Sequence, residues 1–387
     1  MNARTLPGLQ SQLKQLVASP SVSATNPALD MGNRGVIDLL AAWLETLGFS
    51  IEIMPIEGQP NKANLIATLS GGGSGAGGLV LAGHTDTVPY DDNRWQSDPF
   101  KLDERDNRLY GLGSTDMKGF FPLAIEAAKS FADKPLQQPL IILATADEET
   151  SMSGARALVK AGLPKARYAI IGEPTGLKPI RMHKGMMMER LRITGQAGHS
   201  SNPAYGASAL EAMHTAMGEI LKLRGEWQSR FRNPGFAVEV PTLNFGCIHG
   251  GDNPNRICGH TELQFDLRPL PGMAMDELRG ELHQRLNSVV GGDKIKLEMD
   301  SLIGGVEAFE EPAQSELVQA AEKLTGHSAE SVAFATEAPF LQKLGMQTIV
   351  LGPGDIDQAH QPDEYLGLER IDPMVETLRG MIGRFCL

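Results

Sequence analysis

Histidine and acidic residues recur in this chain directly after short apolar segments, where a parallel sheet would deliver side chains to one edge. His84 and Asp86 follow the apolar segment Leu79 to Ala82. They are two residues apart, so on an extended backbone they share one face. The Asp86 carboxylate could then accept a hydrogen bond from one nitrogen of His84 and leave the other nitrogen for a metal ion. The alternative is a loop histidine followed by an aspartate that caps a helix.

Asp116 lies in a glycine-containing segment, Gly111-Leu112-Gly113-Ser114-Thr115-Asp116, directly before an expected helix over 120–131. A capping role at the start of that helix is the simple explanation of this aspartate. The functional interpretation is a carboxylate that a loose turn holds close to His84.

Three adjacent acids, Asp147, Glu148 and Glu149, follow the apolar segment Leu140 to Ala144. Adjacent carboxylates at the end of a buried strand repel one another. A bound cation would relieve this repulsion, with one acid as a ligand and its neighbour as a general base. A solvated acidic loop is the alternative.

Two more side chains that can bind a metal ion also follow apolar segments. Glu173 follows Ala169 to Ile171, and His360 comes after the last apolar segment, Thr348 to Leu351. Together the five positions supply two imidazoles and three carboxylates beside a possible base, which suits a pair of zinc-like ions that share one carboxylate. Two metal ions ~3.5–4 Å apart can activate water and polarise a carbonyl, so the pattern predicts amide hydrolysis.

The elements that must hold these residues alternate between helices and strands. This order predicts an α/β fold with a mostly parallel sheet covered by helices on both faces. Residues 182–292 differ, because strands and helices there follow a β-α-β-β-α-β order typical of a ferredoxin-like domain. We therefore expect a catalytic domain formed by 1–181 and 293–387, with 182–292 inserted as a lid and dimerisation domain.

Composition excludes several other classes. A net charge of −12 argues against binding to nucleic acid or to an anionic membrane surface. Three cysteines without CxxC spacing indicate neither a disulfide framework nor a zinc finger. No apolar segment approaches the ~20 residues that span a bilayer, and residues 1–7 lack the apolar core of a signal peptide, so we expect a cytoplasmic protein. The glycine-rich residues 71–78 lack the Lys-Ser/Thr of a phosphate loop and are expected to form a flexible hairpin connection.

The motifs resemble the co-catalytic dizinc amidohydrolases and exopeptidases, a family that includes aminoacylase, carboxypeptidase G and succinyl-diaminopimelate desuccinylase. The resemblance covers nearly the whole chain. Its main motifs are His84-x-Asp86, Gly113-x-x-Asp116-Met117-Lys118-Gly119, Asp147-Glu148-Glu149 and Gly172-Glu173-Pro174.

The resemblance implies a role for each matching residue. Asp116 bridges two divalent metal ions per subunit, zinc or alternatively cobalt. His84 and Glu173 hold one ion, and Glu149 and His360 hold the other. The resemblance also implies that Glu148 is the general base and that Asp86 orients His84. It implies a homodimer formed through the inserted domain, in which His199 reaches the site of the neighbouring subunit. The Asp116–Met117 peptide is expected to be cis.

The resemblance is strongest to the family members that hydrolyse N2-acetyl-L-ornithine in arginine biosynthesis. Arg256 and Arg268 are then candidates for binding the substrate α-carboxylate, since arginine suits a planar, bidentate contact. Ordinary cross-strand ion pairing, for which Asp266 and Glu262 are available, is the alternative for both. The motifs leave two other functions open: removal of a different acyl or aminoacyl group, and a non-catalytic, metal-stabilised binding protein.

Overall fold

The chain folds into two units in the computed structural model, which describes residues 6–73, 77–90 and 93–387. The first unit contains the chain up to Arg181, Glu311–Glu330 and Thr336–Leu387. The second contains Met182–Glu310 and Ser331–Ala335. Residues 1–5 of the expected N-terminal start and 74–76 of the glycine-rich stretch lie outside the described residues.

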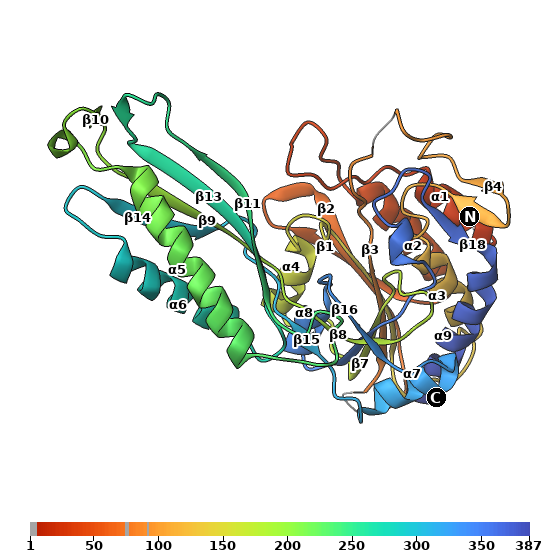
Figure 1. The fold of residues 1–387 in the computed structure, drawn as a ribbon. Coiled ribbons are helices and arrows are strands. Elements are labelled where there is room, and N and C mark those ends of the chain that lie inside the picture. Colours follow the sequence, from red (N-terminus) through yellow and green to blue (C-terminus); the bar gives the residue numbers. More distant parts are fainter. Residues whose placement is uncertain (1–5, 74–76, 91–92) are drawn as a thin grey trace. The chain divides into compact units, whose positions relative to one another are not determined.

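The first unit is built on a sheet with parallel central strands (Figure 1). The strand order is β1-β2-β6-β3-β7-β17-β8-β15, and β16 also pairs with β8. Strands β6, β3, β7 and β17 are parallel, whereas β1, β2, β8 and β15 (Phe309–Glu310) are antiparallel to their neighbours. Because β6 lies between β2 and β3, the glycine-rich connection between these two strands does not close the expected hairpin. Every residue of β3 and β6 is buried, as expected for strands covered on both faces. The bounds are β1 Ser50–Ile56, β2 Gln59–Leu69, β3 Leu79–His84, β6 Leu140–Thr145, β7 Tyr168–Ile171, β17 Gln347–Val350 and β8 Ile180–His183.

Helices cover both faces of this sheet (Figure 1). On one face α3 packs against α1 and α9, and α9 packs against α7; on the other face α4 packs against α8. These helices are α1 Leu9–Val17, α2 Arg34–Thr46, α3 Phe120–Lys129, α4 Ser153–Ala161, α7 Glu316–Thr325, α8 Ala338–Lys343 and α9 Ile371–Phe385. The expected α/β fold with a mostly parallel, doubly covered sheet is confirmed. Within the described ranges, no helix has the length and apolar composition needed to cross a membrane.

A small three-stranded sheet joins two segments that are far apart in the sequence. It has the order β18-β5-β4, and Tyr365 pairs with Tyr110. Its strands are β4 Asp103–Arg105, β5 Arg108–Tyr110 and β18 Tyr365–Gly367. The segment after His360 is therefore held beside the segment that leads to Asp116. Short 3-10 helices lie on either side of β18, Ile356–Gln358 before it and Leu368–Arg370 after it.

The second unit has the predicted β-α-β-β-α-β order. Its sheet runs β11-β13-β9-β14, and α5 and α6 pack side by side along it (Figure 1). The bounds are β9 Met187–Thr194, α5 Ala209–Arg230, β11 Thr242–Gly250, β13 His260–Arg268, α6 Met275–Val289 and β14 Lys296–Ser301. The unit runs past the expected boundary at residue 292, because β14 pairs with β9. Its smaller elements are β10 Gly198–His199, the 3-10 helix Pro203–Tyr205, β12 Arg256–Ile257 and β15 Phe309–Glu310, and β16 spans Glu330–Val332 at the return to the first unit.

Candidate metal centre and active site

His84 is the last residue of β3, and its ring meets two carboxylates. His84 Nε2 lies 3.1 Å from Asp116 Oδ1 and 3.8 Å from Glu173 Oε2. Glu173 comes two residues after β7, which is the parallel neighbour of β3, so the two strand ends bring these side chains together. His84 is only 1% exposed. Burial lowers the pKa of His84, but Glu173 and Asp116 outweigh burial and raise it well above its ordinary value.

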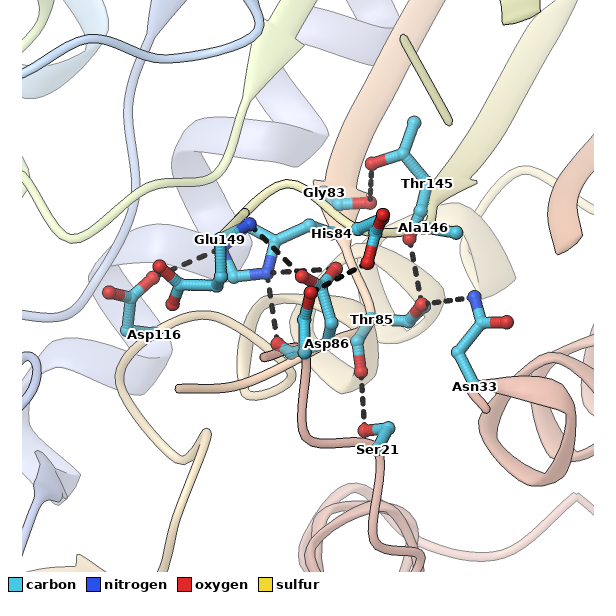
Figure 2. Close-up of polar contacts among 12 residues, drawn as sticks. Ser21, Asn33, Gly83, His84, Thr85, Asp86, Asp116, Thr145, Ala146 and Glu149 are labelled. Carbon is cyan, nitrogen blue, oxygen red and sulfur yellow. Dashed lines mark hydrogen bonds and ion pairs between the residues drawn. The ribbon is translucent and has the colours of Figure 1, made fainter. Parts of the chain in front are cut away.

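Asp116 presents its two carboxylate oxygens to two different histidines. Oδ1 faces His84, and Oδ2 lies 3.4 Å from His360 Nε2. His360 Nε2 is also 3.2 Å from Glu149 Oε1. Figure 2 shows His84, Asp116 and Glu149 converging on one point. Hydrogen bonds with Asp116 and Glu149 raise the pKa of His360 to about 10.

The backbone around these residues is unusual in two places. The Asp116–Met117 peptide is cis, which confirms the expectation from the family resemblance. His360 has a φ of 59°, a left-handed conformation that is uncommon for residues other than glycine. A left-handed backbone at a residue other than glycine is concentrated at functional sites.

Glu364 holds the loop that carries Asp116. Its Oε1 accepts hydrogen bonds from the backbone N–H groups of Thr115 at 2.7 Å and Asp116 at 2.9 Å. Its Oε2 accepts from the N–H of Gly113 at 3.0 Å. One buried carboxylate thus fixes the turn before the cis peptide, and the small sheet around β18 keeps Glu364 in place.

The three adjacent acids after β6 have three different environments. Asp147 Oδ1 lies 2.5 Å from Lys62 Nζ and accepts from Ser23 Oγ at 2.6 Å. Burial raises the pKa of Asp147, but these partners outweigh it and hold the pKa well below its usual range. Glu149 faces His360. The Glu148 carboxylate has no hydrogen-bond or ion-pair partner among the described residues, so it alone of the three is uncommitted.

Asp86 contacts His84 differently from the arrangement expected from the sequence. The near partner of His84 Nδ1 is the Asp86 backbone oxygen at 3.0 Å, whereas Asp86 Oδ1 is 3.8 Å away. The carboxylate instead accepts the N–H of Glu149 at 3.0 Å through Oδ2. Asp86 therefore links the two sides of the site, and orientation of His84 by its carboxylate stays a prediction.

The donor atoms of the site fit divalent metal ions. Ligand atoms of His84, Asp116 and Glu149 all lie within 4.8 Å of one another. Glu173 Oε1 is buried and has no hydrogen-bond partner among the residues that the structure describes. Burial and the neighbouring carboxylates raise the pKa of Glu173 to about 7. Imidazole nitrogens and carboxylate oxygens that surround one point are the ligands that zinc prefers. A cation there would also offset the repulsion among these acids.

The other three predicted site residues belong to the second unit. His199 is exposed, and its Nδ1 accepts hydrogen bonds from the backbone N–H of Ser201 at 3.2 Å and from Ser201 Oγ at 2.8 Å. It pairs with Arg256 in the β10–β12 ladder. Arg256 forms an ion pair with Asp252, and Arg268 Nε lies 2.8 Å from Asp266 Oδ1. Both arginines are therefore ion-paired, but neither pair is cross-strand as the alternative interpretation expected, because Asp252 lies outside the strands and Asp266 lies on the same strand as Arg268.

Sequence reasoning assigned no role to two buried acids of the first unit, Glu364 and Glu337. Glu364 could have been noticed because it follows His360 within one polar segment. Glu337 carries no such signal, since an acid before Ala338-Pro339 resembles an ordinary helix start.

Comparison with known proteins identifies the family. The model of Peptidase family M20/M25/M40 matches residues 80–384. The acetylornithine deacetylase of Edwardsiella ictaluri (strain 93-146) is 50% identical over 381 residues, 98% of each chain. That of Proteus mirabilis (strain HI4320) is 49% identical over 382 residues, 99% of this chain and 98% of the relative. A metallo-carboxypeptidase of Sulfolobus solfataricus shares the fold, with a TM-score of 0.74 and 17% identity over 97% of this chain and 98% of its own. The chain belongs to Peptidase family M20/M25/M40, a family of metal-dependent hydrolases.

Proposed function

We propose that this protein hydrolyses N2-acetyl-L-ornithine to L-ornithine and acetate, a reaction of arginine biosynthesis, in the cytoplasm. Two relatives that are about half identical over nearly their whole length bear the name acetylornithine deacetylase, which supports this substrate. The observation that carries the reaction type is the uncommitted Glu148 carboxylate beside a set of residues suited to metal ions.

Two divalent ions per subunit fit the site, zinc in the first place and cobalt as the alternative. His84 and Glu173 would hold one ion, Glu149 and His360 the other, and Asp116 would be shared by both. The two carboxylate oxygens of Asp116 face the two histidines, which supports this shared role. Bound there, such ions supply Lewis acidity, which polarises the acetyl carbonyl and acidifies a water molecule.

Glu148 moves the proton in this reaction. Burial and the Glu173 carboxylate raise the pKa of Glu148 well above its ordinary value, which makes it a stronger base than an exposed glutamate. It accepts a proton from the attacking water as the new C–O bond forms. It then gives that proton to the ornithine nitrogen as the C–N bond breaks, so acetate and the free amine leave.

His199 is assigned to the developing oxyanion, and it acts in the site of a partner chain within a homodimer formed through the second unit. Its exposure and its engagement with Ser201 through Nδ1 support this, since Nε2 is left for another group. Arg256 and Arg268 are the candidates for the substrate α-carboxylate, and Arg256 is the more exposed of the two.

Two other functions compete with this proposal. The same metal-binding residues could also remove a succinyl group from diaminopimelate or cleave a dipeptide, because they would contact only the amide group of the substrate. A non-catalytic binding protein is disfavoured by Glu148, since a purely structural metal site needs no free base beside its ligands.

Product identification tests the proposal directly. The protein is stripped with a chelator, reconstituted with zinc or cobalt, and given acetyl, succinyl and aminoacyl substrates. We expect acetate and ornithine from N2-acetyl-L-ornithine, no turnover after chelation, and recovery with either metal. Full activity in a preparation verified to be metal-free would contradict the site, and a preference for succinyl-diaminopimelate would contradict the substrate.

A further inference from the structure

A buried carboxylate that the proposed mechanism does not use lies beside the site. Glu337, the residue before α8, is 2% exposed. Its Oε2 accepts a hydrogen bond from Thr145 Oγ1 at 2.8 Å. Its Oε1 is buried and has no hydrogen-bond partner among the described residues. One oxygen of this carboxylate therefore has a donor, and the other has none within the described part of the chain.

The position of Thr145 places Glu337 at the active end of the sheet. Thr145 ends β6 and pairs in parallel register with His84, which ends β3. Burial raises the pKa of Glu337 to about 8, and the charges of His84, Glu173 and Asp86 act on it. The charge of Glu337 in turn acts on Glu148. Glu337 thus stands among the metal-binding residues and the base.

Glu337 is nevertheless not one of the metal-binding residues. Among the described residues it forms no ion pair, whereas His84 and His360 have Asp116, Glu149 and Glu173 as close carboxylates. A buried carboxylate without a cation is costly, so a cation is its natural partner. N2-acetyl-L-ornithine brings one, because its side chain ends in an ammonium group.

We infer that Glu337 binds the side-chain ammonium of the substrate and selects N-acylated amino acids whose side chains are cationic. This inference rests on the proposed function, because it assigns a specificity residue to the same site. The competing explanation is that Glu337 only positions Thr145 and the strand ends. A positioning residue would affect every substrate alike, whereas an ammonium receptor would affect only cationic ones.

The test compares N2-acetyl-L-ornithine with N-acetyl-L-norvaline, which has the same carbon side chain without the ammonium. We expect Glu337→Gln to lower kcat/KM for the ornithine substrate by about 10- to 100-fold, the range for loss of one charged hydrogen bond. For the norvaline substrate, which has no ammonium to lose a contact, kcat/KM should change by less than about threefold. Glu337→Asp keeps the charge and should retain the preference for the cationic substrate, so it serves if Glu337→Gln does not fold.

Glu311→Gln is the matched control, because Glu311 is equally buried, at 3% exposed, and accepts the N–H of Thr348 in the same unit. Glu311→Gln should leave unchanged the ratio of kcat/KM for the ornithine substrate to kcat/KM for the norvaline substrate. Calorimetric binding of L-ornithine against L-norvaline to the zinc-loaded protein gives a readout that is independent of turnover. Equal losses on both substrates in Glu337→Gln, or an unchanged ornithine affinity, would overturn the inference. Failure of the wild type to release acetate from N2-acetyl-L-ornithine would instead overturn the proposed function, and the binding comparison would still decide the role of Glu337.

Discussion

The backbone N–H of Asp116 donates a hydrogen bond of 2.9 Å to Glu364 Oε1, so the proposed bridging residue is oriented by an acid that comes 248 residues later. Glu364→Gln keeps an acceptor for this bond but loses the second carboxylate oxygen, which accepts from Gly113. We expect zinc affinity to fall by about 10- to 100-fold, as for other residues that support metal ligands. Competition with a zinc-binding dye measures this. Wild-type affinity in Glu364→Gln, with Glu311→Gln as the control, would show that the loop needs no such support.

Glu148→Gln separates the base from the ligands. The substitution preserves shape but removes proton acceptance, so turnover should fall by ~10²–10⁴. Both metal ions should remain, since Glu149 rather than Glu148 faces His360. Asp116→Ala should instead lose metal. Metal analysis beside steady-state kinetics distinguishes the two, and an emptied site in Glu148→Gln would assign Glu148 to the ligands.

His183, the last residue of β8, makes the fold sensitive to acid. Burial lowers the pKa of His183 to about 4, with Nδ1 2.8 Å from the Lys184 carbonyl oxygen. The unfolded chain binds a proton below about pH 6.5 that the folded chain does not accept until near pH 4, so the free energy of unfolding falls as the pH falls through this window. His183 can contribute at most about 1.4 kcal/mol per pH unit to the slope of the free energy of unfolding against pH.

Urea unfolding at pH 7, 6 and 5 tests this titration. His183→Gln should show a shallower loss of stability toward pH 5 than the wild type. His327→Gln, at an exposed position, is the matched control and should follow the wild type. Parallel curves for wild type and His183→Gln would mean that His183 does not set the slope.

Mixed dimers test the assignment of His199 to a partner chain. His199→Ala should lose ~10²–10³ in turnover with its metal ions intact, the range for one oxyanion donor. When inactive His199→Ala and Glu148→Ala proteins are unfolded together and refolded, one site of each hybrid would combine Glu148 with His199. Activity should therefore return. Verified hybrids that stay inactive would show that His199 serves its own chain.

Local sequence was enough to predict the framework of this protein. Apolar segments such as β3 and β6 are buried on both faces, and their ends carry His84 and the three acids. Parallel strands end at one edge of a sheet, so residues that follow several strands must meet there. The fold class and the family follow from such patterns, because hydrophobic periodicity and motif spacing are properties of neighbouring residues.

The role of each acidic residue could be determined only from the tertiary structure. Asp147 is set apart from Glu148 because Lys62, 85 residues earlier, lies 2.5 Å from its carboxylate. The nearest acceptor for His84 Nδ1 is the Asp86 carbonyl rather than its carboxylate. Glu337 is revealed only by its place beside Thr145 and its unpaired oxygen. Burial and long-range contacts determine the charge and role of a carboxylate, and neither is encoded in the spacing of adjacent residues.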